Sequence, residues 1–138
     1  MTETMKAAVW AAPERIEYKE MERPTPGPGE ALVRVGYGGI CGSDIMIYLG
    51  KHPRAKPPLI LCHEFSGTIV ECDGDVYEAG TRVAINPLLF CGECYACNTG
   101  TPHICENLGL VGIDQDGGFA EYVAVPLHTI HVLPESIS

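Results

Sequence analysis

Residues 91–105 read CGECYACNTGTPHIC and place Cys91, Cys94, Cys97 and Cys105 within fifteen residues. Gaps of two residues let the first three sulfurs converge on one ion, and residues 98–102 allow a turn that returns Cys105. Four thiolates are a tetrahedral donor set that zinc prefers, and they close its coordination sphere. The spacing therefore predicts a structural zinc site that leaves no position for a substrate.

Spacing alone leaves other uses of these cysteines open. An iron–sulfur cluster also takes four thiolates, and a CxxC pair can be redox-active. Coincidental buried thiols are the remaining alternative. Residues 88–107, called here the cysteine lobe, show no clean period, so we interpret them as a loop folded around metal.

Composition excludes several classes of partner. The 138 residues suit one domain, and 46% apolar with 20% charged residues is typical of a globular chain. A net charge of −9 argues against nucleic acid and anionic membrane surfaces. No apolar run approaches the roughly 18–20 residues of a membrane span, and the first residues do not resemble a signal peptide. A cytoplasmic protein is therefore expected, with its seven cysteines as thiols or metal ligands.

Short runs of strand-forming residues alternate with glycine and proline and predict a mainly β fold, a barrel or sandwich. The expected strands cover residues 6–11, 15–19, 31–37, 65–72, 82–85, 119–125 and 129–133. A short helix is expected over 43–49, with Ser43 or Asp44 near its N-cap. The run PTPGPG at 24–29 predicts a turn or an extended connector.

A second group of side chains has a different chemistry. It comprises Cys41, Ser43 and Asp44 in the run CGSD, and His63 beside Glu64. Taken alone, one Cys and one His fit a core role as well as a metal site. The neighbouring hydroxyl and carboxylates favour a catalytic zinc, which takes three protein ligands and keeps one position open.

The two groups together resemble the zinc-containing medium-chain alcohol and polyol dehydrogenases. The motifs that carry the resemblance are GICGSD (39–44), HEFSG (63–67), GTRV (80–83), the cysteine lobe and GGFAEY (117–122). The resemblance implies a GroES-like β-barrel catalytic domain over residues 1–138. The CGSD form is more similar to the threonine, butanediol and sorbitol dehydrogenases than to the ethanol dehydrogenases.

The resemblance also implies residue roles. Cys41 and His63 match catalytic zinc ligands, and Glu64 matches a carboxylate that lies beside the metal and can approach it. Ser43 matches the hydroxyl that contacts the substrate and begins a proton relay, and Asp44 matches the carboxylate that orients the ligand His. The family transfers hydride between a small alcohol or polyol and NAD or NADP, and the full-length enzyme is expected to be a homo-oligomer.

Some positions depart from the family pattern. Cys62 stands where the family usually has Gly, and we interpret it as a core residue rather than a competing metal ligand. Asp73 replaces Gly or Ala, and Thr81 replaces Asp. Met46 stands where many relatives place a relay His, so a relay beyond the first hydroxyl would need His52 nearby.

A cofactor-binding unit is not found in this sequence. The run GYGGIC at 36–41 fails the GxGxxG pattern at its third glycine and lacks a βαβ context. By resemblance, a Rossmann domain and the third catalytic zinc ligand are expected beyond Ser138. The chain alone is therefore expected to keep the structural zinc, to hold the catalytic zinc weakly and to be inactive. The alternative function is a non-catalytic zinc-binding scaffold module.

Overall fold

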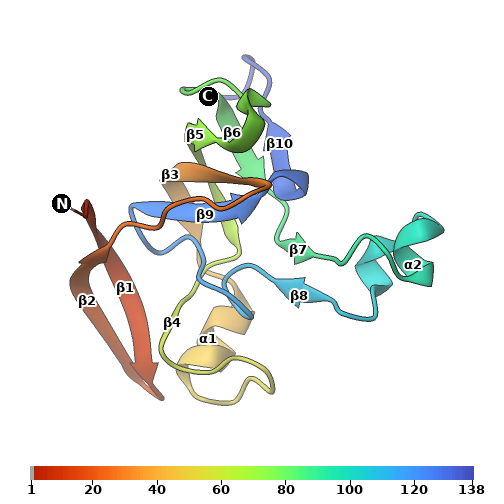
Figure 1. The fold of residues 1–138 in the computed structure, drawn as a ribbon. Coiled ribbons are helices and arrows are strands. Elements are labelled where there is room, and N and C mark those ends of the chain that lie inside the picture. Colours follow the sequence, from red (N-terminus) through yellow and green to blue (C-terminus); the bar gives the residue numbers. More distant parts are fainter. Residues whose placement is uncertain (1) are drawn as a thin grey trace.

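The computed structural model describes residues 2–138 and is built mainly of short strands (Figure 1). The strands are β1 (Thr4–Ala12), β2 (Arg15–Glu22), β3 (Glu30–Gly39), β4 (Leu59–Ile60), β5 (Glu64–Cys72), β6 (Arg82–Ile85), β7 (Leu88–Leu89), β8 (Gly109–Leu110), β9 (Tyr122–Pro126) and β10 (Ile130–Val132). The α-helices are α1 (Gly42–Tyr48) and α2 (Tyr95–Asn98), and 3-10 turns lie at Asp73–Asp75, Pro102–Ile104 and Leu127–Thr129. The prediction of a mainly β fold is confirmed. Among residues 2–138, no helix has the length and apolar character needed to cross a membrane.

The strands of the described chain pair in antiparallel sheets. One sheet has the order β2-β1-β4, and a larger one has the order β10-β6-β5-β3-β9. A bridge between Ala7 and Ala120 joins the two. The small β7-β8 pair forms the base of the cysteine lobe. In the β3–β5 ladder, Gly39 is opposite Glu64, which brings the end of one strand beside the start of the other.

Apolar side chains fill the space between the sheets in three clusters. The largest is rich in β-branched residues from β3, β5, β6 and β9, the type that packs well on a pleated surface: Val33, Ile69, Val83, Val123 and Val125. A second cluster surrounds Trp10 and Ile47, and a third lies under β1. Phe119 packs against all three. The segment that precedes β9 is therefore central to the core although it is not a strand.

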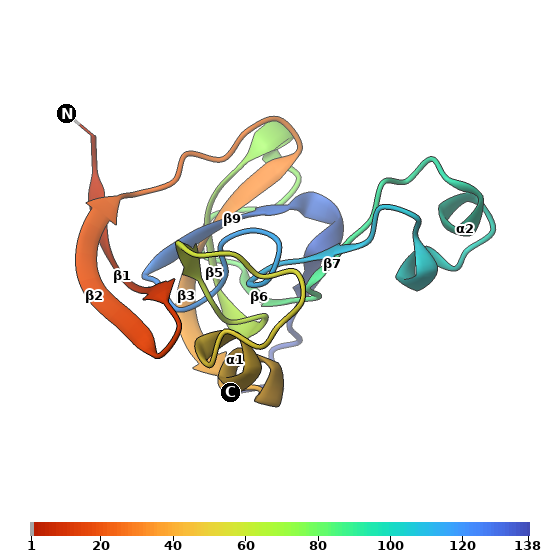
Figure 2. The same ribbon diagram turned by 90° about the horizontal axis from the view of Figure 1, so that it is seen from below.

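Figures 1 and 2 show that the part of the cysteine lobe with α2 projects away from the rest of the protein. Within residues 88–107, only Ala96 and Cys105 are buried. The expectation of a loop holds for most of the lobe. The four-residue helix α2 and the two-residue strand β7 were not predicted, because elements of that length have no detectable periodicity.

Ser43 and Asp44 lie near the N-cap of the first helix, as expected, although neither is the capping residue. Its N-cap is Cys41, so Ser43 and Asp44 lie inside the first turn. The Asp44 carboxylate sits at the third helical position and accepts the backbone N–H of Cys41 at 2.8 Å. An acidic side chain reaching back in this way satisfies a helix-end donor as well as a capping Ser does.

The strand expected over 119–125 begins three residues later, at Tyr122. The preceding residues are extended but change partners along their length. Phe119 donates to the carbonyl of Leu61, whereas Glu121 pairs with Lys6 of β1. This segment links two sheets rather than continuing one ladder.

Candidate metal centres

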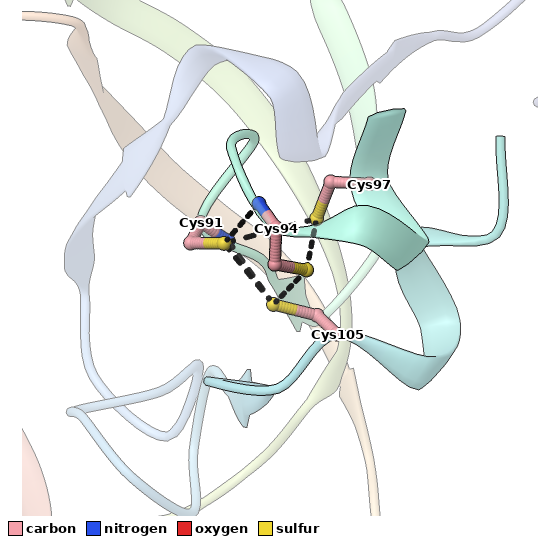
Figure 3. Close-up of side chains that lie close together, drawn as sticks. All are labelled: Cys91, Cys94, Cys97 and Cys105. Atoms are coloured by element: carbon pink, nitrogen blue, oxygen red, sulfur yellow. Dashed lines mark hydrogen bonds between the residues drawn. The ribbon is translucent and has the colours of Figure 1, made fainter. Parts of the chain in front are cut away.

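The four sulfurs of the cysteine lobe point toward one another (Figure 3). The Sγ–Sγ distances are 3.5 Å for Cys94–Cys97 and Cys91–Cys105, and 3.9 Å for Cys91–Cys97 and Cys94–Cys105. A tetrahedron with zinc–sulfur bonds of about 2.3 Å has edges of about 3.8 Å. The cluster therefore fits one tetrahedral zinc ion closely, and the sequence prediction that these four residues converge is confirmed.

Backbone N–H groups around the lobe decide which thiols ionise first. Hydrogen bonds from the backbone of Cys97 and Glu106 lower the pKa of Cys94 to about 6, and those from Glu93 and Cys94 lower the pKa of Cys91. Desolvation raises the pKa of Cys97 to about 12. In the metal-free lobe Cys94 is thus a thiolate at neutral pH and Cys97 keeps its proton. Binding of a dication releases that proton, because metal ligands must be deprotonated.

Cys41, His63 and Glu64, called here the mixed cluster, each present a ligand atom within 4.8 Å of the other two. The β3–β5 register brings these residues together, because Cys41 follows β3 and His63 precedes β5. Gly39 makes room for the carboxylate, since a Cβ there would lie 3.1 Å from Glu64 Oε2. Thiolate, imidazole and carboxylate all suit zinc, and three donors leave one tetrahedral position open.

Two polar side chains adjoin the imidazole. Ser43 Oγ lies 3.4 Å from His63 Nε2, on the half-buried side of the ring. On the other side, His63 Nδ1 is buried and has no hydrogen-bond partner among residues 2–138. Asp44 Oδ1 lies 3.9 Å from this nitrogen, which is beyond hydrogen-bond distance. Nε2 is therefore the nitrogen that faces Ser43, while Nδ1 faces the protein interior.

Asp44, expected as the carboxylate that orients the ligand His, makes no hydrogen bond to His63 among residues 2–138 and accepts backbone N–H groups instead. Its Oδ2 accepts the N–H of Cys41 at 2.8 Å, and its Oδ1 accepts the N–H of Cys62 at 3.3 Å. The side chain is almost completely buried. Asp44 thus ties together the two backbone segments that carry Cys41 and His63. Sequence reasoning did not anticipate this link, because it depends on contacts between distant segments.

Cys62 is a core residue, as interpreted from the sequence. It is fully buried, and its thiol lies 3.5 Å from the carbonyl of Gly39 as a donor. Burial raises its pKa to about 11, so it stays protonated at neutral pH and does not compete as a thiolate ligand. Its φ is +84°, a conformation that favours glycine. This explains why glycine is usual at this position in the family that the sequence resembles.

The residues considered for an extended relay make no hydrogen bond to the mixed cluster among residues 2–138. Met46 is 44% exposed on α1. His52 Nδ1 accepts the backbone N–H groups of Arg54 and Ala55, so that nitrogen is engaged within its own turn. In the part of the chain that the structure describes, no hydrogen bond joins His52 to Ser43 or to the mixed cluster.

A small β domain with a closed four-thiolate centre and an open mixed centre defines the class of this protein. Residues 27–135 match the family model of the alcohol dehydrogenase GroES-like domain, so the chain belongs to that family. It is 41% identical over 143 residues to L-threonine 3-dehydrogenase of Pyrococcus horikoshii, covering 99% of this chain and 41% of that protein. The chain spans about 40% of the length of the curated relatives it matches.

Solved structures agree with the fold. An alcohol dehydrogenase from Escherichia coli CFT073 complexed with its cofactor NADH is 40% identical, with a TM-score of 0.88, and the match covers 98% of this chain and 40% of that one. A cobalt- and zinc-bound thermostable alcohol dehydrogenase from Pyrobaculum aerophilum is 34% identical, with a TM-score of 0.90, covering 99% and 43%. The expected GroES-like fold is confirmed.

Proposed function

We propose that this chain is the catalytic domain of a zinc-dependent, NAD(P)-linked alcohol or polyol dehydrogenase. The observation that carries the proposal is the pairing of two centres of different design in one small domain. The cysteine lobe offers a closed set of four sulfurs, whereas the mixed cluster offers three donors beside a hydroxyl. A closed site suits a structural ion and an open one suits chemistry.

In this proposal, Cys91, Cys94, Cys97 and Cys105 hold a structural zinc, and Cys41, His63 and Glu64 surround the catalytic zinc. A zinc ion bound there supplies Lewis acidity toward an alcohol or carbonyl oxygen. Glu64 is solvent-exposed, so its carboxylate is free to approach or leave the metal. The buried Nδ1 side of His63 leaves Nε2 as its ligand atom.

Ser43 is the proposed first acceptor of the substrate's proton. Its hydroxyl is half-buried and lies beside His63 Nε2 at 3.4 Å, next to the open side of the mixed cluster. Ser43 Oγ accepts a hydrogen bond from the substrate hydroxyl, and its own proton passes on to solvent. Because no other titratable side chain hydrogen-bonds to Ser43 in residues 2–138, we propose that water continues the relay.

The whole protein is proposed to contain a nicotinamide-binding domain and a third zinc ligand outside the present residues. The relatives are more than twice as long as the matched region, and one of them was solved with NADH. The substrate is a small alcohol or polyol, and we propose a cytoplasmic homo-oligomer. Seven cysteines without a disulfide among residues 2–138 support a reducing compartment.

Replacement of the mixed cluster in the full-length protein tests the proposal. Cys41→Ser and His63→Asn should each remove about one zinc equivalent, and alcohol-dependent NADH or NADPH formation should fall at least about 100-fold. Circular dichroism should stay unchanged. Cys72→Ser, which alters a cysteine outside both centres, is the matched control. Activity that survives both substitutions would favour the non-catalytic scaffold function instead.

A further inference from the structure

The peptide bond between Cys62 and His63 is packed against two glycines from a segment about fifty residues further along the chain. A Cβ on Gly117 would lie 2.1 Å from the Cys62 carbonyl oxygen. A Cβ on Gly112 would lie 2.3 Å from the same oxygen and 3.0 Å from His63 N. Such overlaps with backbone cannot be relieved by rotating a side chain. Only glycine fits these two positions with the peptide in its present place.

Hydrogen bonds hold the Cys62–His63 peptide and the backbone that leads into it. The downstream segment donates to three consecutive carbonyls: Gly117 N to Ile60 O at 2.8 Å, Phe119 N to Leu61 O at 3.1 Å, and Gly118 N to Cys62 O at 2.9 Å. From the other side, Asp44 Oδ1 accepts the Cys62 N–H at 3.3 Å. Cys62 itself has a φ of +84°. An L-residue in this region is strained, and the strain persists only where the surroundings hold the residue in place.

We propose that Gly117, supported by Gly112, is a positioning residue for His63. The orientation of the Cys62–His63 peptide sets the direction in which the His63 side chain leaves the backbone. That direction decides whether Nε2 meets Cys41 and Glu64. The inference rests on the proposed function, because it takes the mixed cluster to be a metal site.

Gly67 in β5 provides a matched control. A Cβ there would lie 2.1 Å from the Arg34 carbonyl oxygen, and the atoms it would meet belong to Arg34 and Val33 rather than to the Cys62–His63 peptide. Gly117→Ala and Gly67→Ala therefore both push on backbone, but only Gly117→Ala pushes on the Cys62–His63 peptide. A purely structural role predicts similar effects of the two variants on the mixed cluster.

Cadmium NMR separates the two centres. With excess ¹¹³Cd, the full-length wild-type protein should give a four-thiolate resonance and a second resonance that disappears in His63→Asn. Gly117→Ala should shift or abolish the second resonance and leave the first unchanged, whereas Gly67→Ala should keep both. A second resonance that Gly117→Ala leaves unchanged, or that both glycine variants alter equally, would overturn the positioning role alone. Failure of the full-length wild-type protein to give any His63-dependent resonance would overturn the proposed function and the inference with it.

A measurement on the wild-type chain avoids any folding defect of the variants. If the segment positions His63, metal binding at the mixed cluster must in turn stabilise the segment, because coupling between two sites is reciprocal. Hydrogen exchange at the amides of Gly117, Gly118 and Phe119 should therefore slow at least about threefold when the mixed cluster is loaded and the cysteine lobe is already full. Unchanged exchange at these three amides would refute the coupling.

Discussion

Asp44 Oδ2 accepts the backbone N–H of Cys41 at 2.8 Å, so a side chain inside α1 caps the helix at the residue that presents a candidate metal ligand. The other oxygen of the same carboxylate accepts the N–H of Cys62, one residue before His63. One buried carboxylate therefore fixes the spacing between the two halves of the mixed cluster.

Asp44→Asn should weaken the mixed cluster and the fold together. The amide keeps one acceptor oxygen but turns an –NH₂ group toward one of the two N–H donors. Leaving a buried donor unsatisfied costs about 1–3 kcal/mol, so we expect a loss of about 2 kcal/mol in the free energy of unfolding. Urea denaturation and ¹¹³Cd titration measure the two effects. Asp73→Asn is the control, since Asp73 accepts the N–H of Gly29 away from both centres. Equal metal affinity in Asp44→Asn and wild type would contradict the link.

Alkylation of the metal-free chain should follow the unequal acidities in the cysteine lobe. Because the pKa of Cys94 is about 6, its reaction with iodoacetamide should rise through pH 6 and level off by pH 8. Cys97 and Cys62, with pKa values of about 12 and 11, should still be accelerating at pH 10. Mass spectrometry of the peptides reads out each site. A Cys94 profile centred near pH 9 would contradict the geometry.

The low pKa of Cys94 also makes the stability of the metal-free cysteine lobe depend on pH. The pKa of Cys94 is lower in the folded chain than its ordinary value of 9.0, so ionisation of this thiol stabilises the folded lobe. That contribution is complete above about pH 9 and is lost as the pH falls through about 6. Hydrogen exchange of the lobe amides in the metal-free chain should therefore quicken, after correction for the intrinsic rate, between pH 8 and pH 5.

Chelation should destabilise the cysteine lobe and spare the sheets. The lobe buries only two of its residues, Ala96 and Cys105, so without metal it has little apolar packing to hold it. After zinc removal, amides of residues 91–107 should exchange faster than in the zinc-bound chain, while those of β3 and β5 stay protected. Cys97→Ser should reproduce this with zinc present, and Cys72→Ser should not. Loss of protection in β3 would show that the lobe supports the whole domain.

The chain of 138 residues should retain one zinc equivalent after dialysis. Four thiolates complete the cysteine lobe, whereas the mixed cluster supplies three donors, one of them exposed. Elemental analysis of purified protein gives the stoichiometry, and Cys41→Ser should leave it unchanged. Two tightly held equivalents in the wild-type chain would show that the mixed cluster needs no further ligand.

Substitution of Cys62 tests whether its positive φ strains the backbone next to His63. At an ordinary buried position Ala is more stable than Gly by about 1 kcal/mol, since it buries a methyl group and loses less backbone entropy. A residue with positive φ costs about 1–2 kcal/mol unless it is glycine. We therefore expect Cys62→Gly to be no less stable than Cys62→Ala in urea denaturation. Ala31→Gly, in a fully buried strand position, measures the ordinary cost.

The features that could be predicted from the sequence are those set by residues close together in the chain. The cysteine lobe is one such feature, because its four ligands lie within one short run. Strands β1, β2, β3, β5 and β6 are others, since their residue types and alternation mark them. The Cys41 cap escaped prediction because Asp44 supplies the bond from inside the helix.

Features that depend on contacts between segments far apart in the sequence could not be predicted in this way. The mixed cluster depends on the register that sets Gly39 opposite Glu64. From the sequence, only the family resemblance assigned its three residues to one site. The roles of Gly112 and Gly117 depend on where the Cys62–His63 peptide lies in space. In the sequence they show only as glycines, which fit a turn equally well.

The projection of the cysteine lobe from the sheets also bears on how the protein is made. All four lobe ligands leave the ribosome close together, and the loop they close is short, so its closure entropy is small. The main sheet, by contrast, must wait for β9 before β3 gains its second neighbour. Zinc is therefore able to capture the lobe before the sheet is complete, and the lobe's fold does not depend on completion of the sheet.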